Sequence, residues 1–183
     1  YLAIAMGATR DLFYGNELIL GLNDENRESR LAAIQAVGMV GENSAIKKLE
    51  HIATNSDYQD ERLAATMSLG FIGNINSIPT LNTLLNDHEP NIRWDAAIAL
   101  AKMGEKSSIP IIKNLMDRDY LMTFPELDYN EVTKVIMIAI ETSSLIADSR
   151  FESNLKKLAN YDENLKIRDA AIKTLKSTYD KVI

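Results

Sequence analysis

The sequence has no cysteine among its 183 residues. This absence excludes disulfide bonds, thiol nucleophiles and zinc sites built on thiolates. Long hydrophobic runs are missing as well: the most apolar run, VIMIAI, has six residues, whereas a membrane-spanning helix needs about 20. No signal peptide is visible at the N-terminus. These absences predict a cytoplasmic protein that does not span a membrane.

An excess of basic charge is also absent. The chain has 20 Lys and Arg against 26 Asp and Glu, which gives a formal net charge of -6. Generic binding to nucleic acids or to anionic membranes needs a basic surface, so we expect neither as a partner. Because 46% of the residues are hydrophobic, the chain has enough apolar side chains to bury a core.

The residue patterns of a catalytic site are lacking too. The sequence contains no Gly-rich phosphate-binding loop and no Ser placed beside a His that would activate it. Its acidic residues fall in helix starts and loops, where solvation and helix dipoles explain them. We therefore predict that the protein is not an enzyme and has no cofactor.

An internal repeat is what the sequence does contain. The stretch RLAAIQAVGMVG returns as RLAATMSLGFIG, RWDAAIALAKMG and RDAAIKTLKSTY, and VTKVIMIAIETS keeps the apolar pattern without the Arg and the Gly. These copies begin at Arg30, Arg62, Arg93, Arg168 and Val132. Apolar residues three and four positions apart predict an amphipathic helix in each copy. The Gly that closes three of them suits a left-handed helix end.

A second helix is predicted after each copy. SAIKKLEHIA, SIPTLNTLL and SIPIIKNLM all open with Ser, which we expect to cap the helix, and Pro79 and Pro110 lie in the first turn. No segment alternates with period two over a useful length. One helix pair cannot bury its apolar face alone, but stacked pairs can. We therefore predict an all-α fold, an α-solenoid of stacked antiparallel helix pairs without β-sheet.

The repeat also sets the predicted domain organisation. We expect residues 1–183 to form one α-solenoid domain that is the C-terminal part of a longer chain, because the sequence starts in mid-repeat at Tyr1. The expected parts are a truncated repeat (1–23), regular repeats (24–54, 55–86 and 87–116), an insertion (117–130), a divergent repeat (131–160) and a terminal helix (161–183).

The repeat resembles a known family. R-x-x-A-A-x-x-A-L-x-x-M/I-G followed by S-I-P-x-L is similar to the HEAT-like repeats of phycobilisome lyase subunits, most clearly over residues 24–116. The resemblance implies the fold more than a function, since such repeats occur in scaffolds, bilin lyase subunits, a diiron hydroxylase and DNA glycosylases. It also implies that the second helices line a concave surface.

Four arginines form a predicted ladder along the repeats. Each follows an Asp by five or six residues, and the pairs are Asp24 with Arg30, Asp57 with Arg62, Asp87 with Arg93 and Asp162 with Arg168. One reading is an anion-binding stripe. We favour the other, in which each loop Asp pairs with the Arg of the next helix and fixes the geometry of the repeat.

Two histidines and one tryptophan are further candidates. His88-Glu89 is similar to the dipeptides with which hydroxylases of this repeat class hold two irons, but that site needs four such pairs and this sequence has one. With His51 a repeat away, we predict no metal site. Trp94 stands at a position that is apolar in the regular copies, which favours packing over anchoring a partner.

The outward positions of the second helices form a candidate binding face. They are polar, of mixed charge and more basic toward the C-terminus, so an acidic peptide or protein segment could lie there. The alternative is an ordinary solvated face. The residues are Lys47, Lys48, His51, Asn82, Thr83, Lys113, Asn114, Lys156 and Lys157.

The insertion DRDYLMTFPELDYN lengthens the step between two copies by seven or eight residues. Insertions in repeats map to loops, often at a binding edge, and Pro125 forbids a continuous helix through this one. Tyr120, Met122, Phe124 and Tyr129 are therefore candidate partner-binding residues. The alternative is a lid that covers the flanking helices through apolar side chains such as Leu121 and Leu127.

Together these patterns predict a non-catalytic protein–protein interaction scaffold or adaptor. It would bind a protein or peptide partner through the concave helix face and the 117–130 loop. The resemblance adds an alternative, a bilin lyase or chaperone-like subunit that acts on a phycobiliprotein. A nucleic-acid-binding helical module is a second alternative, which the acidic charge disfavours.

Overall fold

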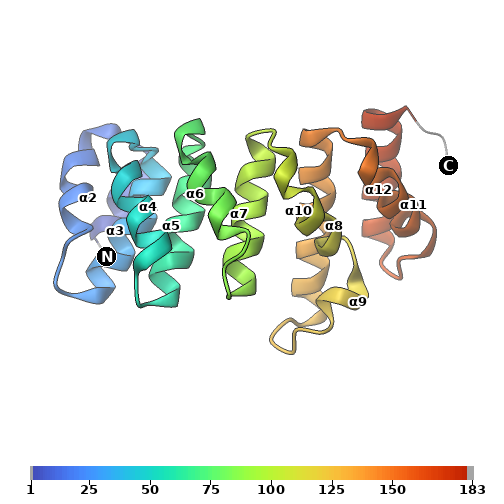
Figure 1. Cartoon of the computed structure of the whole chain (residues 1–183), viewed down its shortest axis with the longest axis horizontal. Helices are drawn as coiled ribbons and strands as arrows, with labels where there is room; N and C mark the ends of the chain where they lie inside the picture. The colour runs from blue at the N-terminus through green and yellow to red at the C-terminus, as the bar shows by residue number, and fades with distance from the viewer. Residues whose placement is uncertain (1, 181–183) are drawn as a thin grey trace. The chain divides into compact units, whose positions relative to one another are not determined.

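The computed structural model of the chain describes residues 2–180, and all regular elements in this range are helical (Figure 1). Tyr1 and residues 181–183, at the ends of the expected truncated repeat and terminal helix, lie outside the described residues. The chain divides into two compact units, one up to Met103 and one from Gly104 onward. None of the helices in residues 2–180 is both long and apolar enough to span a membrane.

The first unit contains seven α-helices in its described residues. They are α1 (Leu2–Thr9), α2 (Gly15–Gly21), α3 (Arg27–Val40), α4 (Ile46–Asn55), α5 (Gln59–Ile72), α6 (Ile78–Leu84) and α7 (Pro90–Lys102). Helices α1, α3, α5 and α7 pack against one another in this order, and α4 and α6 each pack on the helix that follows them. This arrangement is the predicted stack of helix pairs.

The second unit contains five α-helices in its described residues. They are α8 (Ile109–Leu115), α9 (Arg118–Leu121), α10 (Tyr129–Ile146), α11 (Glu152–Tyr161) and α12 (Leu165–Tyr179). Helix α10 packs against both α8 and α12, and α11 packs against α12. The start of α10 carries a capping box. The Asp128 side chain accepts a hydrogen bond from the Glu131 amide, and the Glu131 side chain accepts one from the Asp128 amide.

The predicted glycine helix ends are confirmed. Gly41, Gly73 and Gly104 have φ angles of 79°, 66° and 81°, a conformation that costs Gly little because it has no Cβ. The predicted Ser caps are wrong. Ser77 and Ser108 are instead the last residues of short 3₁₀ turns with helical backbone angles, and neither caps through its side chain. The capping side chain at Ser77's turn is Asn74, which accepts the Asn76 amide.

Small residues allow the first helices of neighbouring pairs to pack closely in the first unit. A Cβ added to Gly38 on α3 would lie 2.7 Å from the Cα of Ser68 on α5. A Cβ added to Gly70 on α5 would lie 2.9 Å from the Cβ of Ala99 on α7. Ser68 also donates from its buried hydroxyl to the Ile34 carbonyl at 2.8 Å. These contacts set the spacing of the helices on which the candidate site residues lie.

Candidate partner-binding surfaces

The arginine ladder is built from backbone as well as side-chain contacts. Each Arg donates to the backbone carbonyl six residues before it, from Arg30 to Asp24 at 2.8 Å and from Arg93 to Asp87 at 2.7 Å. Arg168 donates to the Asp162 carbonyl in the same way. The Arg therefore clamps the loop that precedes its own helix.

This contact differs from the expected pairing of the Arg with the Asp carboxylate. The carboxylates of Asp24, Asp87 and Asp162 instead accept the backbone amide two residues later, at 2.8 to 2.9 Å. Such a turn shapes the loop and leaves the carbonyl facing the Arg. In one repeat Ser56 holds this place rather than Asp57: its carbonyl accepts from Arg62 and its hydroxyl from the Tyr58 amide.

The same arginines also reach the next repeat. Arg30 donates to the Glu61 carboxylate on α5 at 2.8 and 3.1 Å, and Arg62 lies 3.8 Å from the Asp87 carboxylate. Both acids are largely buried in the first unit, so the pairs are well shielded from water. The ladder thus joins each of these loops to its own helix, and Arg30 and Arg62 also join their repeats to the ones that follow.

On the first unit, the candidate second-helix residues lie on α4 and α6, which contact each other. Lys47 is exposed and pairs with Glu50 at 3.0 Å, and His51 is exposed. Asn82 and Thr83 donate to carbonyls of their own helix at 3.0 and 3.2 Å. These polar groups are largely satisfied locally, so the face is polar but offers few unpaired groups.

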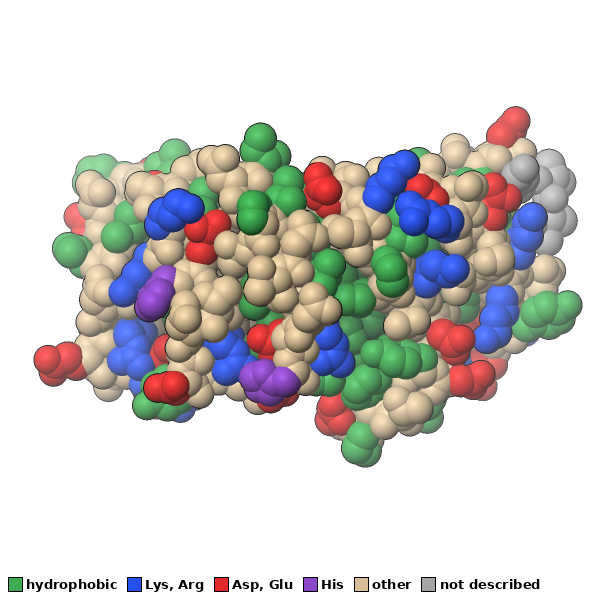
Figure 2. Space-filling view, in the orientation of Figure 1, with side chains coloured by type: hydrophobic (Ala, Val, Ile, Leu, Met, Phe, Trp, Pro, Cys, Tyr) green, Lys and Arg blue, Asp and Glu red, His purple; other side chains and the backbone are tan. Residues whose placement is uncertain are grey.

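On the second unit, the candidates lie on α8 and α11. Asn154 on α11 donates to the Lys113 carbonyl on α8 at 3.5 Å, and Lys157 on α11 pairs with Asp117 just after α8 at 3.4 Å. These contacts place half-exposed Lys113 of α8 near the exposed Lys156 and Lys157 of α11, and we call this surface the α8–α11 face. Figure 2 shows Lys and Arg side chains gathered over this region.

The 117–130 insertion is anchored at its first half. Asp117 caps α9 by accepting the amides of Asp119 and Tyr120, and Leu121 is fully buried. Tyr120 and Phe124 are half-buried and stack edge to face, with ring centroids 5.2 Å apart. This part of the segment packs locally, as a lid would.

Two of the four candidate side chains of the insertion face solvent instead. Met122 is 58% exposed and Tyr129 is 47% exposed. Figure 2 shows hydrophobic side chains gathered on the surface in this part of the second unit. The segment is therefore fixed in place by buried contacts while it presents apolar surface to the solvent.

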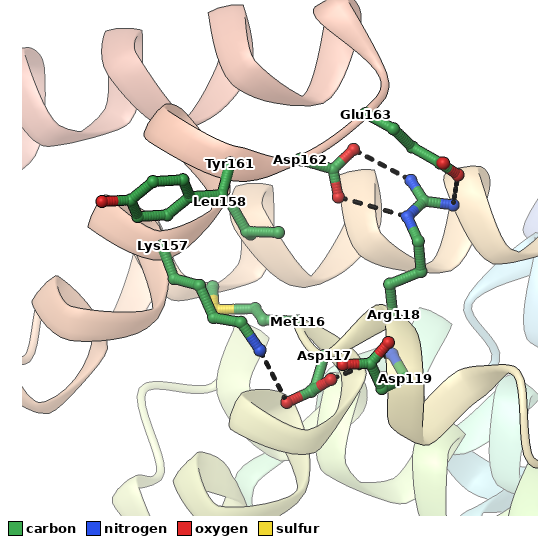
Figure 3. A pocket seen from close by; sticks show the side chains of 9 residues that line it. All are labelled: Met116, Asp117, Arg118, Asp119, Lys157, Leu158, Tyr161, Asp162 and Glu163. Atoms are coloured by element: carbon green, nitrogen blue, oxygen red, sulfur yellow. Dashed lines mark hydrogen bonds and ion pairs between the residues drawn. The ribbon is translucent and has the colours of Figure 1, made fainter.

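Arg118 fastens the insertion to the loop before α12, and the residue was missed by the sequence patterns (Figure 3). Its guanidinium donates to both carboxylate oxygens of Asp162 at 2.9 and 3.3 Å and lies 3.5 Å from Glu163. Val132 stands where the other copies carry the ladder Arg. Arg118 thus supplies from the insertion the contact to the next repeat that Val132 cannot make. Two features of the sequence indicate this role: the ladder Arg is absent at Val132, and the insertion contains an Arg of its own, Arg118.

A small cavity lies between the insertion and the end of α11 (Figure 3). Its volume is about 190 Å³, and its floor is formed by the buried side chains of Met116 and Leu158. The ion pairs of Lys157 with Asp117 and of Arg118 with Asp162 lie on its two sides. Lys157 lines this cavity and also belongs to the α8–α11 face.

Two segments of the chain, residues 16–70 and 55–121, match the profile of the HEAT repeats. Together they extend over residues 16–121, which is more than half of the 183 residues. The chain belongs to the HEAT repeat family. No curated protein sequence matches it.

Solved structures of other proteins are similar to this chain. The complex of CpcE and CpcF of phycocyanin lyase from Nostoc sp. PCC7120 matches with a TM-score of 0.70 and 17% identity, over 91% of this chain and 65% of that chain. YibA from Escherichia coli matches with a TM-score of 0.65 and 17% identity, over 96% of this chain and 62% of that chain. This HEAT repeat chain therefore spans slightly less than two thirds of the proteins it matches. At such low identity the likeness shows the fold alone.

The remaining candidates of this HEAT repeat chain, His88 and Trp94, are both engaged by neighbouring residues or buried. His88 is exposed beside Asp87 and Glu89, and its Nε2 accepts from the Arg62 guanidinium at 3.2 Å. Within residues 2–180, no three His, Asp or Glu side chains are grouped so that they could hold a metal ion. Trp94 is buried, with 6% exposure, so its ring is not presented to solvent.

One acid of the HEAT repeats has an unusual environment. Burial raises the pKa of Asp95 to about 6, and the nearby Lys102 opposes this only in part. Asp95 stands two residues after the ladder Arg, where Ala32 and Ala64 stand in the preceding repeats. A carboxylate thus occupies a packing position that suits a small apolar side chain.

Proposed function

We propose that the protein is a non-catalytic interaction scaffold that binds a segment of another protein through the α8–α11 face and the 117–130 insertion. The proposal rests chiefly on Met122, which is 58% exposed on a segment whose neighbour Leu121 is fully buried. Because buried Leu121 anchors the segment, a partner that contacts Met122 does not have to order the segment first, which lowers the cost of binding.

The geometry of the insertion refines which residues test this proposal. Tyr120 and Phe124 stack on each other, so their removal alters packing as well as any binding. Tyr129 has its ring 5.1 Å from the Arg118 guanidinium, so it also supports the anchoring of the segment. Met122 is the cleanest probe, because its side chain is exposed.

The test is cross-linking and co-purification with the full chain carrying Met122→Ser. We expect the partner recovered with the wild-type chain to be lost or strongly reduced, with the melting temperature nearly unchanged, because exposed substitutions seldom alter stability. Met67→Ser is the matched control, since Met67 is 43% exposed on α5 of the other unit. Equal recovery with both variants and the wild type would remove the insertion from the binding surface.

The fold likeness to the phycocyanin lyase subunits favours one other candidate, a lyase or chaperone-like subunit that acts on a phycobiliprotein. The chain would then change the visible absorption of a bilin mixed with the pigment-free phycobiliprotein. An absorption spectrum that is the same with and without the chain would exclude this candidate. A gel shift at low salt tests the nucleic-acid alternative in the same preparation.

A further inference from the structure

The α8–α11 face carries lysines with few acids among them. Helix α8 contains no Asp or Glu, and the single acid of α11, Glu152, lies in its first turn. Lys113 extends from α8, and Lys156 and Lys157 extend from α11, where both are exposed. The two helices are linked through Asn154 and the Lys113 carbonyl. With Glu152 and Asp117 paired to Lys156 and Lys157, the three lysines leave a small local excess of positive charge on a chain whose net charge is -6.

We propose that the segment bound at the α8–α11 face is an acidic peptide whose carboxylates pair with Lys113, Lys156 and Lys157. This inference rests on the proposed function and specifies the chemistry of the partner. Opposite charges on facing surfaces raise the rate of encounter and select the partner.

The existing ion pairs of these lysines leave room for such a partner. Lys156 lies 3.8 Å from Glu152 and Lys157 lies 3.4 Å from Asp117, and the two lysine side chains are 51% and 59% exposed. Ion pairs this exposed are weak, since water screens them. The ammonium groups can therefore turn toward carboxylates of a bound segment at little cost.

The insertion sets a boundary to the acidic part of the segment. Beyond Lys157 the cavity of Figure 3 is lined by Asp117, Asp119 and Glu163 over an apolar floor. These acids repel further carboxylates. The acidic residues of the partner therefore lie over α8 and α11, and an uncharged side chain lies over the cavity.

The test uses fluorescence anisotropy with the full chain and labelled synthetic peptides. One peptide alternates Glu with Ala, and the other has Gln in place of every Glu. We expect the Glu peptide to bind and the Gln peptide not to bind, and the affinity to fall when salt is raised from about 50 to about 200 mM. Combining Lys113→Glu, Lys156→Glu and Lys157→Glu should weaken binding about tenfold or more, because each change replaces an attraction by a repulsion.

The matched control reverses three exposed lysines of α10 and α12 in the same unit, Lys134→Glu, Lys173→Glu and Lys176→Glu. It makes the same change in net charge and should leave the affinity within about twofold. Equal loss in both triple variants, or equal binding of the Glu and Gln peptides, overturns the proposal. If the Glu peptide does not bind but Met122→Ser still abolishes partner recovery, the acidic chemistry is wrong and the scaffold function stands.

Discussion

At the scale of single residues, Arg118 is the side chain on which the irregular junction depends. It makes a bidentate contact with Asp162, a residue that is only 7% exposed. Removal of one partner of such a pair leaves the other charge buried and unpaired. The stability of the second unit should therefore respond to Arg118 more than to other surface arginines.

We expect Arg118→Ala to lower the free energy of unfolding by about 2 to 3 kcal/mol, as measured by denaturant unfolding of the full chain. The control is Arg150→Ala, since Arg150 pairs with Asp148 two residues away and is 54% exposed. That variant should leave stability nearly unchanged. Equal effects of the two substitutions would show that the Asp162 contact is no more important than an exposed pair.

Asp95 gives a second prediction, on the pH dependence of stability. Burial raises its pKa from the ordinary value of 3.8 to about 6, so between these values the folded state binds more protons than the unfolded state. Stability from this group is therefore fully present below about pH 4 and falls as pH rises toward 6. We expect Asp95→Ala to stabilise the protein by about 1 to 2 kcal/mol at pH 8.

The same variant should show no such gain near pH 4, where the carboxyl group is protonated in the folded protein. Thermal melts of wild type and Asp95→Ala at the two pH values measure the difference. A gain of equal size at both pH values would attribute the effect to helix propensity and packing rather than to the buried charge.

At the scale of elements, the spacing of the first helices depends on glycines within them. A Cβ at Gly38 would approach both the Cα and the hydroxyl of Ser68, at 2.7 and 2.5 Å, whereas a Cβ at Gly70 would meet only Ala99, with its Cβ at 2.9 Å and its Cα at 3.6 Å. A neighbouring backbone yields less readily than a methyl group. An added methyl group should therefore be tolerated less well between α3 and α5 than between α5 and α7.

We expect Gly38→Ala to destabilise the protein by about 1 to 3 kcal/mol despite the better helix propensity of Ala. Gly70→Ala should be clearly less destabilising. Chemical unfolding of both variants under the same conditions gives the comparison. A reversed order would mean that α3 and α5 can separate more easily than α5 and α7.

The insertion is also best understood as an element. Pro125 correctly predicted a break in the helix, and the structure has α9 before it and α10 from Tyr129 after it. The sequence leaves two interpretations of the insertion, a lid and a binding segment. Leu121 packs inward, as expected of a lid, while Met122 faces solvent, where binding of a partner stays a prediction.

At the scale of the whole molecule, the periodic features of the sequence were sufficient to predict the all-α repeat fold. Helix pairs and glycine ends follow from spacing and from local backbone preference, which neighbouring residues determine. The contact of Arg118 with Asp162 spans 44 positions and exists only once the second unit has packed. The approach of Gly38 to Ser68 likewise depends on how two helices cross, which no local pattern contains.

The candidate sites were less predictable for a related reason. The pattern identified Lys113, Lys156 and Lys157 as outward residues, and the structure has them exposed or half-exposed. It did not indicate that Asn82 and Thr83 bond to their own helix. A polar side chain that already donates to a backbone carbonyl of its own helix is less available to a partner. The alignment of the repeats does not predict which side chains do so.

Arg118 takes the place of the missing ladder arginine, and this limits which changes of sequence the chain can tolerate. The insertion and Val132 form a matched pair, since the first supplies the contact that the second lacks. Shortening the segment while Val132 remains would leave Asp162 without its cation. A variant that loses the insertion must therefore regain an arginine at the start of α10, and the two changes are tolerated together more readily than either alone.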